Sequence, residues 1–132
     1  MSYEESLKSI SLVADASIGI YTGVPGLPGS PQPHGGKQYC FLEVTGVGTA
    51  GLCTAAARSV GVLQNKPQEV GHAATVGISG VTRIITGGVV TAGDEIEVDA
   101  SGRGVTKSAG VTVAIALDTS TGADQLIPAL LV

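Results

Sequence analysis

Two cysteines, two histidines and a run of carboxylates are the residues of this chain whose types could support chemistry. The cysteines are Cys40 and Cys53, the histidines are His34 and His72, and their spacing is not that of a metal site. Nucleophilic catalysis requires a Ser or Cys beside a His and a carboxylate, and the sequence presents no such arrangement. We therefore expect no catalytic residues, no cofactor and no bound metal.

The carboxylates gather around one predicted strand. Glu95, Glu97 and Asp99 alternate along it and follow Asp94 at a turn, so the three share one face. Such a cluster can hold Ca²⁺, but the spacing does not match an EF-hand loop. We expect a solvated strand face whose like charges discourage edge pairing, with Asp99 paired to Arg103 across the next turn.

Residues 46–51 read Gly-Val-Gly-Thr-Ala-Gly and so match the dinucleotide-binding pattern GxGxxG. In that type of site a crossover helix and a second parallel strand follow, over about 30 residues per unit. Here only about two helical turns would fit before the next predicted strand. The pattern therefore favours a β-hairpin over a cofactor site.

The acidic N-terminus, residues 1–5, is not followed by an apolar segment. We expect no secretory signal, synthesis in the cytosol and two free thiols. A two-residue turn at Gly46-Val47 would bring Cys40 and Cys53 face to face in a geometry that permits a disulfide. The sequence leaves open whether the two cysteines ever pair.

The composition excludes several classes of partner and favours short strands. The 132 residues include 20 Gly and 6 Pro, and only 3% are aromatic. Such a chain suits strands joined by tight turns around one modest core. The net charge of −4, with seven dispersed cations, argues against nucleic acid. No apolar run approaches the ~20 residues of a membrane span.

Alternating apolar residues and turn signals predict an all-β fold, a single small compact β-barrel or sandwich of about ten short strands. A register change at Gly80 predicts a bulge or corner, and Gly87-Gly88 predicts a turn. The expected core includes Val62, Val76, Ile78 and Ile96. The predicted strands lie within residues 9–22, which hold two strands around a turn at Ala14-Asp15, and within 38–44, 52–56, 59–65, 73–78, 81–85, 89–91, 95–99, 111–117 and 126–132.

The chain divides into an N-terminal arm, residues 1–8, and one β domain, residues 9–132. Within the domain, residues 23–36 contain four prolines and five glycines and predict a long Pro/Gly-rich surface loop. The loop includes three Gly-X-Pro triplets, too few to sustain a collagen triple helix.

An ordered series of segments resembles the small head-decoration, or capsid cement, proteins of tailed bacteriophages. The resemblance covers roughly residues 15–132, and the Pro/Gly-rich loop looks like the actinophage branch of that family. It implies a β-rich structural protein, without catalytic residues, that binds the outside of the icosahedral head and stabilises it. The segments are 60–67 (VGVLQNKP), 71–76 (GHAATV), Gly80-Val81, Gly88, 92–94 (AGD), 99–103 (DASGR) and the closing stretch 115–132.

The resemblance also implies partners and a location. The partners are the major capsid protein and further copies of the chain, with a trimer as the favoured homo-oligomer. The location is the outer capsid surface of the virion, after synthesis in the host bacterial cytoplasm. The apolar terminal strand would be covered in such an oligomer. The charged, unpatterned arm supplies the candidate capsid contacts Ser2, Tyr3, Glu4 and Glu5.

The alternative hypothesis is a β-rich carrier or binding module, or an accessory subunit, without catalysis of its own. In that case the region 71–105 would present a ligand. A biotinyl or lipoyl carrier needs an exposed Lys at a hairpin tip. Lys66 precedes a proline and Lys107 lies in a polar stretch, so neither fits that role well.

Overall fold

The protein is described here from a computed structural model that places residues 7–18, 37–67 and 70–132. These residues form ten strands, which confirms the predicted all-β class. The strands are β1 (Lys8–Ala14), β2 (Phe41–Gly46), β3 (Thr49–Leu52), β4 (Gly61–Leu63), β5 (Ala73–Ser79), β6 (Val81–Val90), β7 (Glu95–Val98), β8 (Gly104–Thr106), β9 (Ala114–Ala116) and β10 (Ser120–Leu131). Within the placed ranges, no helix exists that could cross a membrane.

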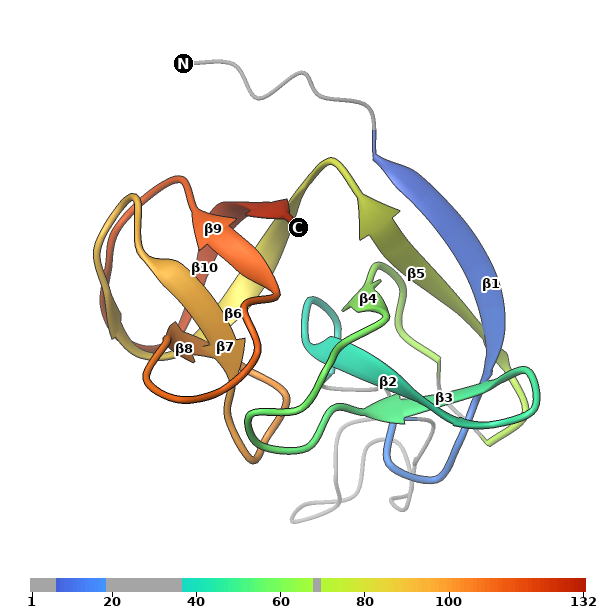
Figure 1. The fold of residues 1–132 in the computed structure, drawn as a ribbon. Helices are drawn as coiled ribbons and strands as arrows, with labels where there is room; N and C mark the ends of the chain where they lie inside the picture. Colours follow the sequence, from blue (N-terminus) through green and yellow to red (C-terminus); the bar gives the residue numbers. More distant parts are fainter. Residues whose placement is uncertain (1–6, 19–36, 68–69) are drawn as a thin grey trace, which may run out of the picture.

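The strands form two closed five-stranded barrels, which appear as two lobes in Figure 1. Barrel one consists of β1–β5 and barrel two of β6–β10. The sequence indicated one barrel or sandwich and did not indicate this division. Gly80 alone separates β5 from β6, and its φ of 102° lies in a region that side chains disfavour. The predicted corner at Gly80 is therefore confirmed, and it is the point where the chain leaves one barrel for the other.

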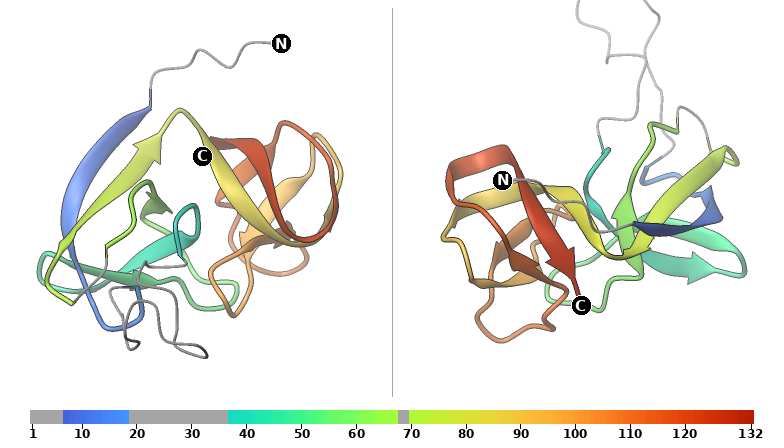
Figure 2. Two further views of the ribbon diagram at one scale, coloured as in Figure 1. Left: turned by 180° about the vertical axis from the view of Figure 1, so that it is seen from behind. Right: turned by 90° about the horizontal axis from the view of Figure 1, so that it is seen from above.

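The two barrels have the same topology. In each, the first strand pairs in parallel with the third and antiparallel with the fifth. The second strand pairs antiparallel with the third and the fourth, and the fourth pairs antiparallel with the fifth. Figure 2 shows the two lobes side by side from two further directions.

The registers of the two barrels also agree residue by residue. In the second and third strands, Leu42 pairs with Leu52 in barrel one as Ile96 pairs with Thr106 in barrel two. Equivalent residues stay equivalent around the whole sheet, so barrel two is a structural repeat of barrel one. The repeat reaches the loops, where the Tyr39 amide donates to the Leu63 carbonyl at 2.7 Å and the Gly93 amide donates to Ala116 at 2.8 Å.

The repeat departs from symmetry where the barrels meet. In barrel one, the Val13 amide of the first strand donates directly to Gly48 at 2.8 Å, in the turn between β2 and β3. In barrel two, the equivalent Ile85 amide donates at 3.1 Å to Tyr39 of barrel one, and the equivalent Gly102 carbonyl accepts at 2.7 Å from Phe41. Residues 39–41 of barrel one are therefore inserted into barrel two.

Successive side chains of β2 and β4 point into different cores. Leu42 and Leu63 pack inside barrel one, whereas their neighbours Phe41 and Val62 belong to the core of barrel two. This follows from the two-residue period of a strand, which sends alternate side chains to opposite faces. Two strands of barrel one thus supply side chains to both cores, which joins the barrels through apolar contact.

Phe41 is the only phenylalanine in the chain and is fully buried. Its ring lies against Gly104, where an added Cβ would approach the Phe41 Cε2 atom to 3.3 Å and atoms of Ile84 and Ile96 to 2.9 Å. The corresponding residue of barrel one, Ala50, carries a methyl group. Glycine at position 104 therefore leaves the space that the aromatic ring requires.

Several sequence predictions need correction or refinement. Gly87-Gly88 do not form a turn, because both lie inside β6 and pair with β10. Gly87 instead accommodates the Asp99 carboxylate, which occupies the place of its missing side chain. Ile78, expected in the core, is 39% exposed. Residues 16–18, at the start of the second strand predicted in 9–22, form a turn instead. The rest of that predicted strand and the loop 23–36 fall outside the placed ranges.

Replacing Phe41 by alanine should lower the free energy of unfolding by about 3–5 kcal/mol, because it empties the contact between the two cores. Urea denaturation followed by circular dichroism measures the change. Val89→Ala removes an exposed β6 side chain and serves as the control, with an expected loss below about 0.5 kcal/mol. Similar losses for the two variants would contradict a shared core that depends on Phe41.

Candidate functional site at the junction of the two barrels

The glycine pattern of residues 46–51 forms a hairpin, as the sequence predicted. β2 ends at Gly46 and β3 begins at Thr49, so the turn is Val47-Gly48. Ala50 and Gly51 continue into β3, and no helix follows them that could hold a pyrophosphate at its N-terminus. The dinucleotide pattern is therefore part of barrel one and not a cofactor site.

Cys40 and Cys53 are free, buried thiols, in agreement with the prediction from a reducing compartment. Burial raises the pKa of Cys40 above its ordinary value. Burial, with the nearby Glu43 carboxylate, raises the pKa of Cys53 to about 11. Because the thiolate is the reactive form, both side chains act as small apolar core residues rather than as nucleophiles.

The carboxylates of β7 do not form the solvated face that the sequence predicted. Glu97 is only 8% exposed. It accepts hydrogen bonds from the Ser108 amide at 3.1 Å, the Ser108 hydroxyl at 3.0 Å and the Gly110 amide at 2.6 Å. The loop after β8 covers Glu97 through these bonds. β7 pairs with β8 on one side and with β9 on the other, so it is not an edge strand.

These contacts lower the pKa of Glu97. The largest cause is the hydrogen bond from the Ser108 amide, and the Ser108 hydroxyl and Gly110 amide act in the same direction against the effect of desolvation. The predicted ion pair of Asp99 with Arg103 is confirmed at 3.0 Å, and Arg103 also contacts Asp124 at 3.1 Å.

Every carboxylate side chain in the placed ranges accepts a hydrogen bond from this chain. Backbone amides, hydroxyls and the Arg103 guanidinium are the donors. The eight residues are Asp15, Glu43, Asp94, Glu95, Glu97, Asp99, Asp118 and Asp124. Searched over the placed ranges, the chain brings no three His, Cys, Asp or Glu side chains together as metal ligands.

The contact residues predicted from the arm, Ser2, Tyr3, Glu4 and Glu5, and also His34, lie outside the placed ranges. The structure instead shows two adjacent hollows, one between the barrels and one on barrel one, which sequence analysis did not find. One has a volume of about 360 Å³ and is lined by Arg58, Ser59, Val111, Thr112, Val113 and Val132. The other, of about 530 Å³, is lined by Glu43, Val44, Ala57, Arg58, Ser59 and Val60.

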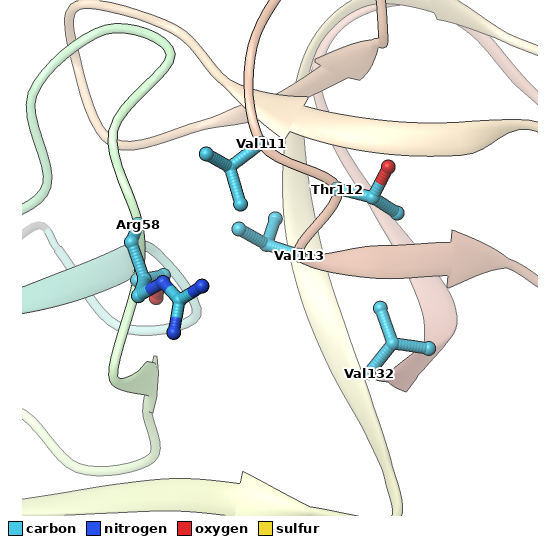
Figure 3. A pocket seen from close by; sticks show the side chains of 6 residues that line it. Arg58, Val111, Thr112, Val113 and Val132 are labelled. Carbon is cyan, nitrogen blue, oxygen red and sulfur yellow. The ribbon is translucent and has the colours of Figure 1, made fainter.

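Arg58 and Ser59 are common to both hollows, since they form the ridge between them. Figure 3 shows the Arg58 side chain extending from the loop of barrel one toward the space beside Val113 and Val132 of barrel two. Sequence reasoning counted Arg58 among dispersed cations. Only the packing of the barrels places residues 111–113 and 132 opposite it.

Comparison with known proteins supports the fold. No protein-family model matches the chain, and no curated protein matches it significantly. Among solved structures, the chain is similar to the head fiber gp8.5 N base of bacteriophage phi29. The TM-score is 0.63 at 13% sequence identity, over 95% of each chain. The likeness thus covers nearly the whole chain.

Glu97→Gln should be less stable than the unmodified protein at pH 7, because glutamine lacks the charge that three donors stabilise. The folded pKa of Glu97 lies below its ordinary value of 4.5, so the stabilisation is present above that value and is lost as the pH falls through the folded pKa. Denaturation series from pH 7 to pH 3 measure it. Glu95→Gln removes one exposed acceptor and should have the smaller effect at pH 7. If the difference in unfolding free energy between the unmodified protein and Glu97→Gln grew toward pH 3, this assignment would be contradicted.

The native protein should react with a thiol reagent at pH 8 at least tenfold more slowly than the same protein in denaturant, where two thiols become available. The reason is that both cysteines are buried and their pKa values are raised. Absorbance of the chromophore that the reagent releases measures the rate of modification and the number of thiols modified. Fast modification of the folded protein, or fewer than two thiols after unfolding, would contradict the assignment.

Proposed function

We propose that this chain is a structural protein of a tailed-phage head that binds the outer surface of the shell as a decoration, or cement, protein. The observation that carries the proposal is the likeness over 95% of both chains to a base of a phage head fiber. The ordered sequence segments that resemble head-decoration proteins point in the same direction independently. Together they support attachment to a phage head.

The physical character of the molecule suits that role. Two barrels that share an apolar core and backbone hydrogen bonds form a rigid unit, which loses little conformational freedom when it binds a surface. The net charge of −4 disfavours binding to DNA. The partner that we propose is therefore the major capsid protein, on the outer face of the virion, after synthesis in the host cytoplasm.

We further infer that the protein acts without catalysis, cofactor or metal, and as a homo-oligomer with a trimer as the favoured state. Among the exposed large apolar side chains, Val44, Val111 and Val132 line the hollows around Arg58, which supports contact with other copies or with the shell. Residues 129 and 130 of the terminal strand β10 pair with both β6 and β9, so the strand is not the free edge that the sequence suggested.

Stabilisation by such a protein acts through mass action. A copy that binds the assembled shell and not its separated subunits stabilises the shell by RT ln(1 + [L]/Kd) at each site. This amounts to about 2.7 kcal/mol at a hundredfold excess over Kd. Small contributions at many symmetric sites would allow a small protein to oppose the pressure of packaged DNA.

Genome-filled heads that lack the protein should rupture at a higher temperature after the purified protein is added to saturation. Release of DNA, followed by dye fluorescence during heating, measures the threshold, and heads without added protein are the control. Equal thresholds at saturated binding would reject the stabilising role. Complete lack of binding would reject attachment to the head and favour the carrier or accessory-module alternative.

A further inference from the structure

We propose that the hollows around Arg58 receive an acidic, aliphatic segment of the shell protein, with a carboxylate paired to the Arg58 guanidinium. This inference rests on the proposed function and names the chemistry of the contact. The Arg58 surface is defined by Val44, Arg58, Ser59, Val60, Val111 and Val132.

The Arg58 surface combines apolar side chains from both barrels. Val44 of barrel one is 57% exposed, and Val111 and Val132 of barrel two are 39% and 71% exposed. They line the two hollows on either side of Arg58. Aliphatic side chains around a central arginine are typical of the energetically dominant part of a protein interface.

Arg58 has no ionic partner in the part of the chain that is described. All seven lysines and arginines lie in that part, and of these only Arg103 forms an ion pair there. Glu43 lines the 530 Å³ hollow, yet it accepts from Thr54 and makes no ion pair with Arg58. An exposed guanidinium among valines is therefore available to a carboxylate from outside.

The backbone on both sides of Arg58 is fixed before any partner arrives. The Ala56 amide donates to the Val98 carbonyl of barrel two at 2.8 Å. The Ser59 hydroxyl donates to the Leu42 carbonyl at 2.9 Å, and the Val60 amide donates to the same carbonyl at 2.8 Å. The loop that carries Arg58 is thus anchored to both barrels, which reduces the entropy lost on binding.

The two hollows differ in the group that each suits. The 360 Å³ hollow is lined by Arg58 without any Asp or Glu side chain, and the guanidinium extends toward it (Figure 3). The 530 Å³ hollow contains Glu43 together with Val44 and Val60. We assign the incoming carboxylate to the first hollow, where a bidentate pair with the guanidinium forms, and a neighbouring aliphatic side chain to the second.

A different protein, rather than a second copy of this chain, is the expected source of the carboxylate. The eight carboxylate side chains in the placed ranges each accept a hydrogen bond from their own chain. A carboxylate that is held in this way is less free to turn toward Arg58 of another copy. The proposed function puts this chain on the shell, so we commit to the shell protein as the partner.

The test measures the affinity of Arg58→Gln for undecorated heads by co-sedimentation over a concentration series. We expect Kd to rise at least tenfold, and Arg58→Lys to fall between that variant and the unmodified protein, because lysine keeps the charge but not the bidentate geometry. Arg83→Gln is the matched control, since Arg83 is also exposed and without an ion pair in the described part of the chain. The Kd of Arg83→Gln for the heads should stay within about twofold of the Kd of the unmodified protein.

Thermal unfolding of each variant shows whether the fold is retained, and sedimentation without heads gives the oligomeric state. Equal affinities of Arg58→Gln and Arg83→Gln would overturn the assignment of Arg58 while leaving the proposed function intact. If the unmodified protein does not bind heads, the proposed function fails instead. A change of oligomeric state caused by Arg58→Gln alone would replace the shell protein with a second copy as the occupant.

Discussion

The burial of Phe41 in the core of the neighbouring barrel is the interaction on which the rest of the structure depends. A single residue, Gly80, links the barrels along the chain, so their relative position has to be fixed by contacts elsewhere. Phe41 and Val62 provide the apolar contacts between the barrels. Two backbone hydrogen bonds, from Ile85 to Tyr39 and from Phe41 to Gly102, provide the polar contacts. The surface around Arg58 exists only because this junction is fixed.

The internal repeat explains how a chain with few large side chains builds a stable fold. A five-stranded barrel of some 50–70 residues buries a limited fraction of its surface, and domains of that size are marginal on their own. Here two such barrels with matching registers share part of their cores. The repeat is broken at residues 39–41, where one barrel enters the other. This difference between the two repeats therefore holds the barrels together.

The polar side chains in the placed ranges fall into two groups. Carboxylates such as Glu97 stabilise the fold, whereas Arg58 makes no ion pair there. Glu97 and Asp99 hold loops of barrel two through several hydrogen bonds each, and Cys40 and Cys53 are buried with raised pKa values. These residues looked like candidates for chemistry in the sequence, yet they stabilise the fold. Arg58, one of seven scattered cations in the sequence, makes no ion pair within the placed ranges and lies between two hollows that are partly lined by valines.

Local patterns in the sequence determined the all-β class, the hairpin at residues 46–51, the corner at Gly80 and the Asp99–Arg103 pair, because each depends on residues close together in the chain. The tertiary structure alone decided the division into two barrels. Repeated barrels need similar side-chain size and direction at equivalent positions, not identical residues, so the repeat left no clear sequence period. It also decided the burial of Glu97, which depends on a loop that returns from after the next strand. The placement of Arg58 opposite Val111 and Val132 was decided in the same way, since no local pattern encodes a contact between residues more than fifty positions apart.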